Sequence, residues 1–123
     1  MKNIHLILVI VFLSTSCTSV VLNEEGENYL QLLKEETQAE IEIKSGFEGR
    51  IGQEDLEFII LDIDFSENPN QIQYYDDKDK LEPIAKQIYL TTINRRKFNR
   101  FRVNIFSTDY RESFIFETKK FDK

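Results

Sequence analysis

The chemistry open to this chain rests on carboxylates, because its 123 residues contain a single histidine, His5, and a single cysteine, Cys17. Asp62 and Asp64 alternate along an apolar stretch, so a β-strand would hold their β-carbons about 6–7 Å apart on one face. That separation is near the range for an inverting glycosidase, in which one carboxyl protonates the leaving group and the other activates water. A catalytic acid also needs burial to raise its pKa. Two solvated carboxylates on the outer face of a strand are the alternative, so the pair is a weak catalytic candidate.

Calcium binding is the second kind of chemistry that clustered carboxylates support. Residues 62–68 place oxygen-bearing side chains at alternate positions, as a calcium loop does. However, Glu67 stands where such a loop needs glycine, and Gln73 stands where it needs a bidentate glutamate. The acidic run at 76–79 is interrupted by Lys78. We therefore expect no metal site and no cofactor.

The densest charged feature is a run of five bases within eight positions, with two phenylalanines between them. These bases are Arg95, Arg96, Lys97, Arg100 and Arg102. The run is a candidate contact for an anionic partner, such as lipid headgroups, lipopolysaccharide phosphates or an acidic envelope protein. A structural role is the alternative, because cations complement the dipole at the end of a helix and pair with acids across strands. Tyr74 and Tyr75 are further candidate contact residues, unless one of them packs inward.

The first residues have the order of a secretory leader. A short positive start at Met1-Lys2-Asn3 is followed by an apolar run from Ile4 to Leu13, and small residues then precede Cys17. The apolar run is shorter than the about 20 residues that a membrane-spanning helix needs. These features predict a cleaved signal peptide at 1–17.

The residues around the predicted cleavage site resemble the lipobox of bacterial lipoproteins. Ser14, Thr15 and Ser16 stand before Cys17, although Leu13 lies four residues ahead of it where three is usual. The resemblance implies that Cys17 is acylated and becomes the new N-terminus, which attaches the chain to a membrane of the cell envelope. Thr18, rather than aspartate, follows, and this favours the outer membrane where the organism has two.

Removal of the leader would leave no histidine, no tryptophan and no cysteine apart from Cys17. Catalysis by Ser-His-Asp or Cys-His groups, zinc sites built on histidine and cysteine, and disulfides within one chain are then excluded. Charge is polarised, because residues 18–85 hold 18 acids and 5 bases whereas residues 86–123 hold 4 acids and 10 bases. Such asymmetry indicates a charged partner, and export argues against nucleic acid.

The elements that would position these residues follow from hydrophobic periodicity. Helical spacing predicts a helix at 24–38, with Asn23 as its cap and Leu32 widening its apolar stripe, and a second at 80–96, with Asp79 and Glu82 in capping-box spacing. Alternation predicts strands at 41–47, 57–65 and 101–105, a last strand through Phe114 and Phe116 that ends near Phe121, and a short optional strand at 71–75. In the strongest strand, Ile59, Leu61, Ile63 and Phe65 are expected to face the core.

This order, α-β-β-(β)-α-β-β, predicts an α+β fold with an antiparallel-rich sheet of four or five strands and two helices on one face. We expect a leader at 1–17, a short tether at 18–23 and a single domain at 24–123. The function that fits is a non-enzymatic envelope lipoprotein, anchored through Cys17, that acts as a binding or adaptor module. The alternatives are an inhibitor or immunity-type lipoprotein, and a carboxylate-dependent hydrolase of envelope glycans that uses Asp62 and Asp64.

Overall fold

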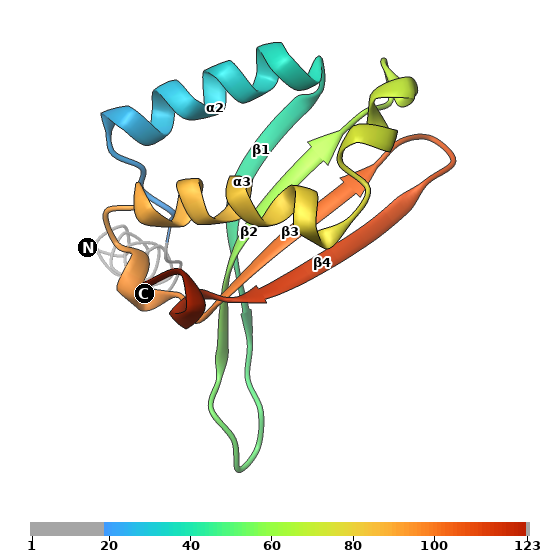
Figure 1. Ribbon diagram of the computed structural model, residues 1–123. Helices are drawn as coiled ribbons and strands as arrows, with labels where there is room; N and C mark the ends of the chain where they lie inside the picture. Colours follow the sequence, from blue (N-terminus) through green and yellow to red (C-terminus); the bar gives the residue numbers. More distant parts are fainter. Residues whose placement is uncertain (1–18, 123) are drawn as a thin grey trace, which may run out of the picture.

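The computed structural model describes residues 19–122, so the leader and the acylation site at Cys17 lie outside the described residues. Helices and strands alternate as two groups of one helix and two strands (Figure 1). Their bounds are α2 Glu24–Thr37, β1 Glu40–Glu48, β2 Leu56–Asp64, α3 Lys78–Leu90, β3 Arg100–Phe106 and β4 Arg111–Glu117. The predicted α+β class is confirmed.

The sheet has four strands in the order β1-β2-β3-β4. The pairs β1–β2 and β3–β4 are antiparallel hairpins, whereas β2 and β3 run parallel, with Phe58 opposite Arg100 and Asp64 opposite Phe106. A parallel pair needs a crossover connection, and α3 lies in that connection. Figure 1 shows α2 and α3 on the same side of the sheet, as predicted, and the β1–β2 hairpin extending beyond it.

The core lies between the sheet and the two helices. Ile59, Leu61 and Ile63 of β2 are fully buried, and Phe65 continues the same apolar row just beyond the strand. Strand alternation sends every second side chain to the helix-covered face, and this confirms the predicted core row. Helix α3 supplies the opposing side chains, with Leu81, Ala85 and Ile88 fully buried.

Helix α2 begins where the sequence predicts. The Asn23 side chain accepts a hydrogen bond from the Gly26 amide at 2.9 Å, which satisfies one of the free amides of the first turn. Leu33 and Thr37 are buried against the sheet. Leu32, expected to widen the apolar stripe, is instead 61% exposed, because it lies on the side of the helix that turns away from the sheet.

Helix α3 differs from the prediction at both ends. Asp77, and not Asp79, caps it by accepting from the Lys80 amide at 2.9 Å. The helix ends at Leu90 instead of continuing to 96, because the Thr92 amide bonds to the Tyr89 carbonyl in a 3-10 turn and the Ile93 amide bonds to the Val21 carbonyl instead of to a helix carbonyl.

Two further segments also depart from expectation. The prediction of a short strand at 71–75 is wrong, since Pro69–Tyr74 forms a 3-10 helix with proline in its first turn. That winding lets Ile72 and Tyr75, three residues apart, both pack against the core. The last strand ends at Glu117, and Thr118–Asp122 forms a 3-10 helix that buries Phe121.

The helices of the described residues can be compared with the length and hydropathy that a bilayer requires. Between residues 19 and 122, no helix combines the length and the apolar character needed to cross a membrane.

Candidate functional site

Residues 19–23, which we call the N-terminal strap, are hydrogen-bonded to the turn at 91–94. Leu22 and Thr92 form an antiparallel bridge. On either side of it, the Asn23 amide donates to the Thr91 carbonyl at 2.9 Å and the Ile93 amide donates to the Val21 carbonyl at 2.7 Å. The segment expected to be a tether is therefore bonded to the domain.

Asn94 closes the outer end of the strap. Its side-chain amide donates to the Ser19 carbonyl oxygen at 2.7 Å, and its side-chain oxygen accepts from the Val21 amide at 3.1 Å. One side chain thus satisfies two backbone groups that no strand partner would satisfy. The path of the chain is fixed as far out as Ser19, two residues after Cys17.

The strap leaves an apolar pair facing outward. Leu22 packs against the core and Thr92 is buried, so both point inward. Their neighbours Val21 and Ile93 lie opposite each other in the same antiparallel pairing and therefore project from the other face. Val21 is 46% exposed and Ile93 is 66% exposed. Two β-branched side chains side by side on the surface form a small apolar patch.

Three bases of the predicted run come directly after the turn at 91–94. Arg95–Lys97 forms a 3-10 turn of its own, which we call the basic turn, in place of the expected helix end. Arg96 and Lys97 are exposed and Arg95 is half-buried. Within residues 19–122, none of the three forms an ion pair, whereas Lys119 and Lys120 near the C-terminus both do. In the described part of the chain, the basic turn therefore carries its positive charge without a direct ion pair.

Arg95 also faces the end of α3. Burial raises the pKa of Tyr89, and the hydrogen bond of its hydroxyl to the Asp122 carboxylate, at 3.0 Å, raises it further. The nearby Arg95 charge opposes this increase. The basic turn therefore lies close to both α3 and the C-terminal 3-10 helix.

The remaining two bases of the run belong to a different surface. Arg100 and Arg102 lie on β3, on the sheet face that the helices do not cover. Arg100 approaches Glu117 of β4 at 3.7 Å, and the Arg102 guanidinium lies 4.6 Å from the centre of the Phe58 ring. The structure therefore divides the run between an uncompensated turn and two bases with partners on the sheet.

Asp62 and Asp64 lie on that same open face, as the alternation predicts. Asp62 pairs with Lys44 at 2.9 Å through one oxygen and accepts from the side-chain amide of Asn104 at 2.8 Å through the other. Asp64 accepts from the Ser66 amide at 2.9 Å. The hydrogen bond to Asp62, with the attraction of its charge, raises the pKa of Lys44. Both carboxylates thus have partners that hold them in place.

A recess beside the two aspartates is shallow and acidic. Its volume is about 320 Å³, and Glu40, Glu42 and Phe106 line it together with the aspartates. Within residues 19–122, however, no three carboxylates come together in an arrangement that could hold a metal ion. In the described structure the recess is therefore an acidic surface hollow that is not arranged as a metal site.

Tyr74 and Tyr75 do not form a joint patch. Tyr75 stacks on Phe65, with ring centres 5.7 Å apart, whereas Tyr74 is 60% exposed. One of the two packs inward, which is the alternative that the sequence left open.

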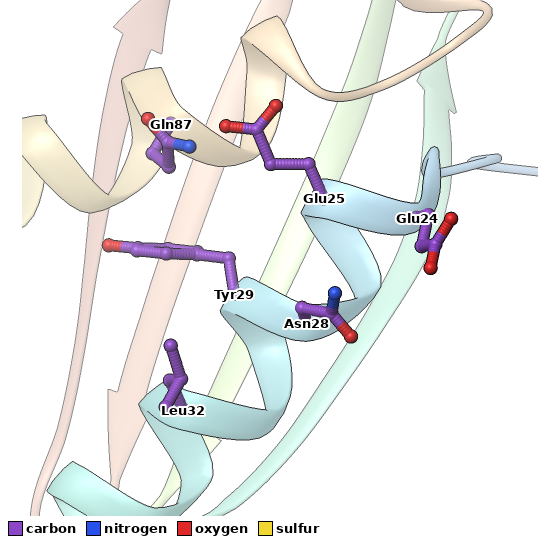
Figure 2. A pocket seen from close by; sticks show the side chains of 6 residues that line it. All are labelled: Glu24, Glu25, Asn28, Tyr29, Leu32 and Gln87. Atoms are coloured by element: carbon purple, nitrogen blue, oxygen red, sulfur yellow. The ribbon is translucent and has the colours of Figure 1, made fainter.

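A groove of about 510 Å³ lies between α2 and α3. Figure 2 shows Tyr29 and Glu25 reaching from α2 toward Gln87 of α3, with Leu32 beside Tyr29. Burial, with the negative charge of Glu36, raises the pKa of Tyr29. The groove is open to solvent. The sequence gave no sign of the groove, because two helices far apart in the chain create it.

Comparison with known proteins adds no family: no family model, no curated protein and no solved structure matches this chain.

Sequence reasoning missed the pairing of the strap, including Val21, with Ile93 and Asn94. The one signal that pointed to them was the apolar run Val20-Val21-Leu22, which is unusual for a solvated tether. Its partners lie some 70 residues further along the chain, and no local pattern pairs the two segments.

Proposed function

We propose that this protein is a lipoprotein of the bacterial cell envelope, anchored through Cys17, whose α+β domain acts as a binding module at the membrane surface. The observation that carries the proposal is the N-terminal strap. Ser19 is fixed by Asn94, and two residues span at most about 7 Å. A lipid on Cys17 would therefore hold one defined side of the domain against the bilayer.

The geometry of the carboxylates supports a binding role over hydrolysis. Asp62 is engaged by Lys44 and Asn104, and Asp64 by Ser66. The recess beside them is open, whereas a general acid gains its raised pKa from an enclosed, water-poor environment. An inhibitor or immunity-type lipoprotein is one form that a binding module of this kind can take.

The anchor is tested by expressing the whole chain in a bacterial host and comparing it with Cys17→Ser. For the unmodified sequence we expect a chain that begins at Cys17, carries a diacylglyceryl group and sediments with membranes. For Cys17→Ser we expect loss of the lipid and of membrane association. Ser19→Ala is the matched control, because only the backbone of Ser19 is bonded.

Intact-mass measurement and membrane fractionation give the result. An unmodified chain that keeps Met1, or a processed chain without diacylglycerol, would contradict the proposal.

A further inference from the structure

The outward pair Val21 and Ile93 lies beside the basic turn Arg95–Lys97, which begins two residues after Ile93. We propose that the surface they form docks on anionic phospholipid headgroups of the leaflet that holds the Cys17 lipid. The inference rests on the proposed function, since the anchor brings the surface to the membrane. It adds an orientation: this surface of the domain contacts the bilayer, so the domain does not rotate freely about its lipid anchor.

Charge is the first argument. The basic turn places three consecutive bases together, none with an ion-pair partner in the described part of the chain, whereas Lys44, Lys80, Arg100, Lys119 and Lys120 each pair with a carboxylate. The acids that follow the strap, Glu24 and Glu25, line the groove between α2 and α3 instead of the apolar pair. Phosphate-bearing headgroups would supply the missing negative charge.

The apolar pair is the second argument. Val21 and Ile93 project from one face of the strap pairing, and the basic turn begins two residues after Ile93. Apolar side chains flanked by bases are the composition that settles at the boundary between headgroups and acyl chains. The strap pairing turns both side chains outward, and insertion at the boundary between headgroups and acyl chains would cover them.

The position of the anchor is the third argument, and it selects the lipid over a protein partner. Asn94 bonds both to Ser19 and to Val21, so the chain leaves the domain next to the patch itself. With at most about 7 Å between Ser19 and Cys17, an acyl chain inserted in the bilayer would leave no room for a folded protein between the patch and the headgroups.

The test uses the full chain, acylated in a bacterial host, in vesicles of phosphatidylcholine alone or mixed with phosphatidylglycerol. Acylation consumes the Cys17 thiol, so an introduced cysteine is the only free thiol and can carry an environment-sensitive dye. Ile93→Cys reports on the patch, and Thr108→Cys reports on the β3–β4 loop at the other end of the sheet. We expect the dye at 93 to shift to the blue and to resist an aqueous quencher only with phosphatidylglycerol, and the dye at 108 to stay accessible.

The charge requirement is tested by R95Q/R96Q/K97Q, with K34Q/K78Q/R111Q as the matched control that removes the same charge elsewhere. Each base near an anionic surface contributes up to about a fivefold change in affinity, so the first triple variant should reduce docking by up to about 100-fold. The control should dock as the parent does. Both variants should still float with the vesicles, because the lipid anchor is intact.

Three results would overturn the inference. In the first, the dye at 93 is quenched equally with and without phosphatidylglycerol although the protein floats. In the second, the two triple variants dock alike. In the third, protection of the dye appears only on addition of an acidic envelope protein. A chain that lacks the lipid and does not float refutes the proposed function instead, and intact mass separates that failure from the others.

Discussion

Asn94 holds Ser19 through a hydrogen bond of 2.7 Å from its side-chain amide to the Ser19 carbonyl oxygen, although 75 residues separate the two along the chain. The same side chain accepts from the Val21 amide. The outer end of the N-terminal strap therefore depends on a single residue of the turn that follows α3.

Replacing Asn94 by alanine should loosen the strap. Two hydrogen bonds are lost at a partly exposed site, so we expect the free energy of unfolding to fall by about 1–2 kcal/mol. Urea denaturation measures this loss, and the Val21 amide should exchange its hydrogen faster. Asn70→Ala is the control, because only the Asn70 backbone carbonyl is bonded. Equal exchange at Val21 in both variants would refute the role of Asn94.

Glycine is needed at position 26, where α2 meets the turn after α3. A β-carbon there would lie 2.6 Å from the Thr91 hydroxyl oxygen and 2.9 Å from its β-carbon. We expect Gly26→Ala to lower the free energy of unfolding by about 1–3 kcal/mol, against the usual helix preference for alanine. Thermal or urea unfolding checks it.

The same substitution at Gly46 provides the comparison. There a β-carbon would meet chiefly the terminal methyl of Ile60, at 2.7 Å, which is the far end of a flexible side chain. Gly46→Ala should therefore cost less than Gly26→Ala, and the reverse order would show that the contact with Thr91 is not limiting.

The neighbouring tyrosines should respond differently to truncation. Tyr75 stacks on the buried Phe65, so Tyr75→Ala should lower the free energy of unfolding by about 1–3 kcal/mol. Tyr74 is exposed, and Tyr74→Ala should change it by less than about 0.5 kcal/mol. Urea unfolding of the pair decides the matter, and equal losses would contradict the inward packing of Tyr75.

Tyr110 should lose its hydroxyl proton at a higher pH than an ordinary tyrosine does. The hydrogen bond from its hydroxyl to the Glu112 carboxylate raises the pKa of Tyr110 from 10.0 to about 12. Because the folded pKa lies above the unfolded one, the stabilisation is complete below pH 10.0 and is lost as the pH rises through about 12. The ultraviolet difference spectrum between the parent and Tyr110→Phe isolates this titration. Glu112→Gln should return the pKa of Tyr110 toward its ordinary range. An unchanged midpoint in that variant would exclude the Glu112 carboxylate as the cause of the raised pKa.

Local patterns accounted for most of the fold. The alternation of Ile59, Leu61 and Ile63 placed β2 and chose its buried face, and the short polar side chain of Asn23 marked the start of α2. Both signals depend only on residues within one element, so sequence alone carries them.

The elements that were predicted wrongly depend on contacts between residues that lie far apart in the sequence. The alternation in residues 71–75 resembles a strand, but Pro69 and the need to turn Ile72 and Tyr75 onto the core produce a 3-10 helix. The candidate site shows the same limit. The basic run was visible, yet its division between a free turn and two bases on β3 follows from where α3 ends.

The strap also determines where a mechanical load would enter the molecule. A pull on the chain ahead of Ser19 acts first on the hydrogen bonds to residues 91–94, and so reaches the link between the two halves of the sheet. Helix α2, which follows the strap, would come under load only after those bonds break. Drag on a tethered molecule would thus be borne by the middle of the chain.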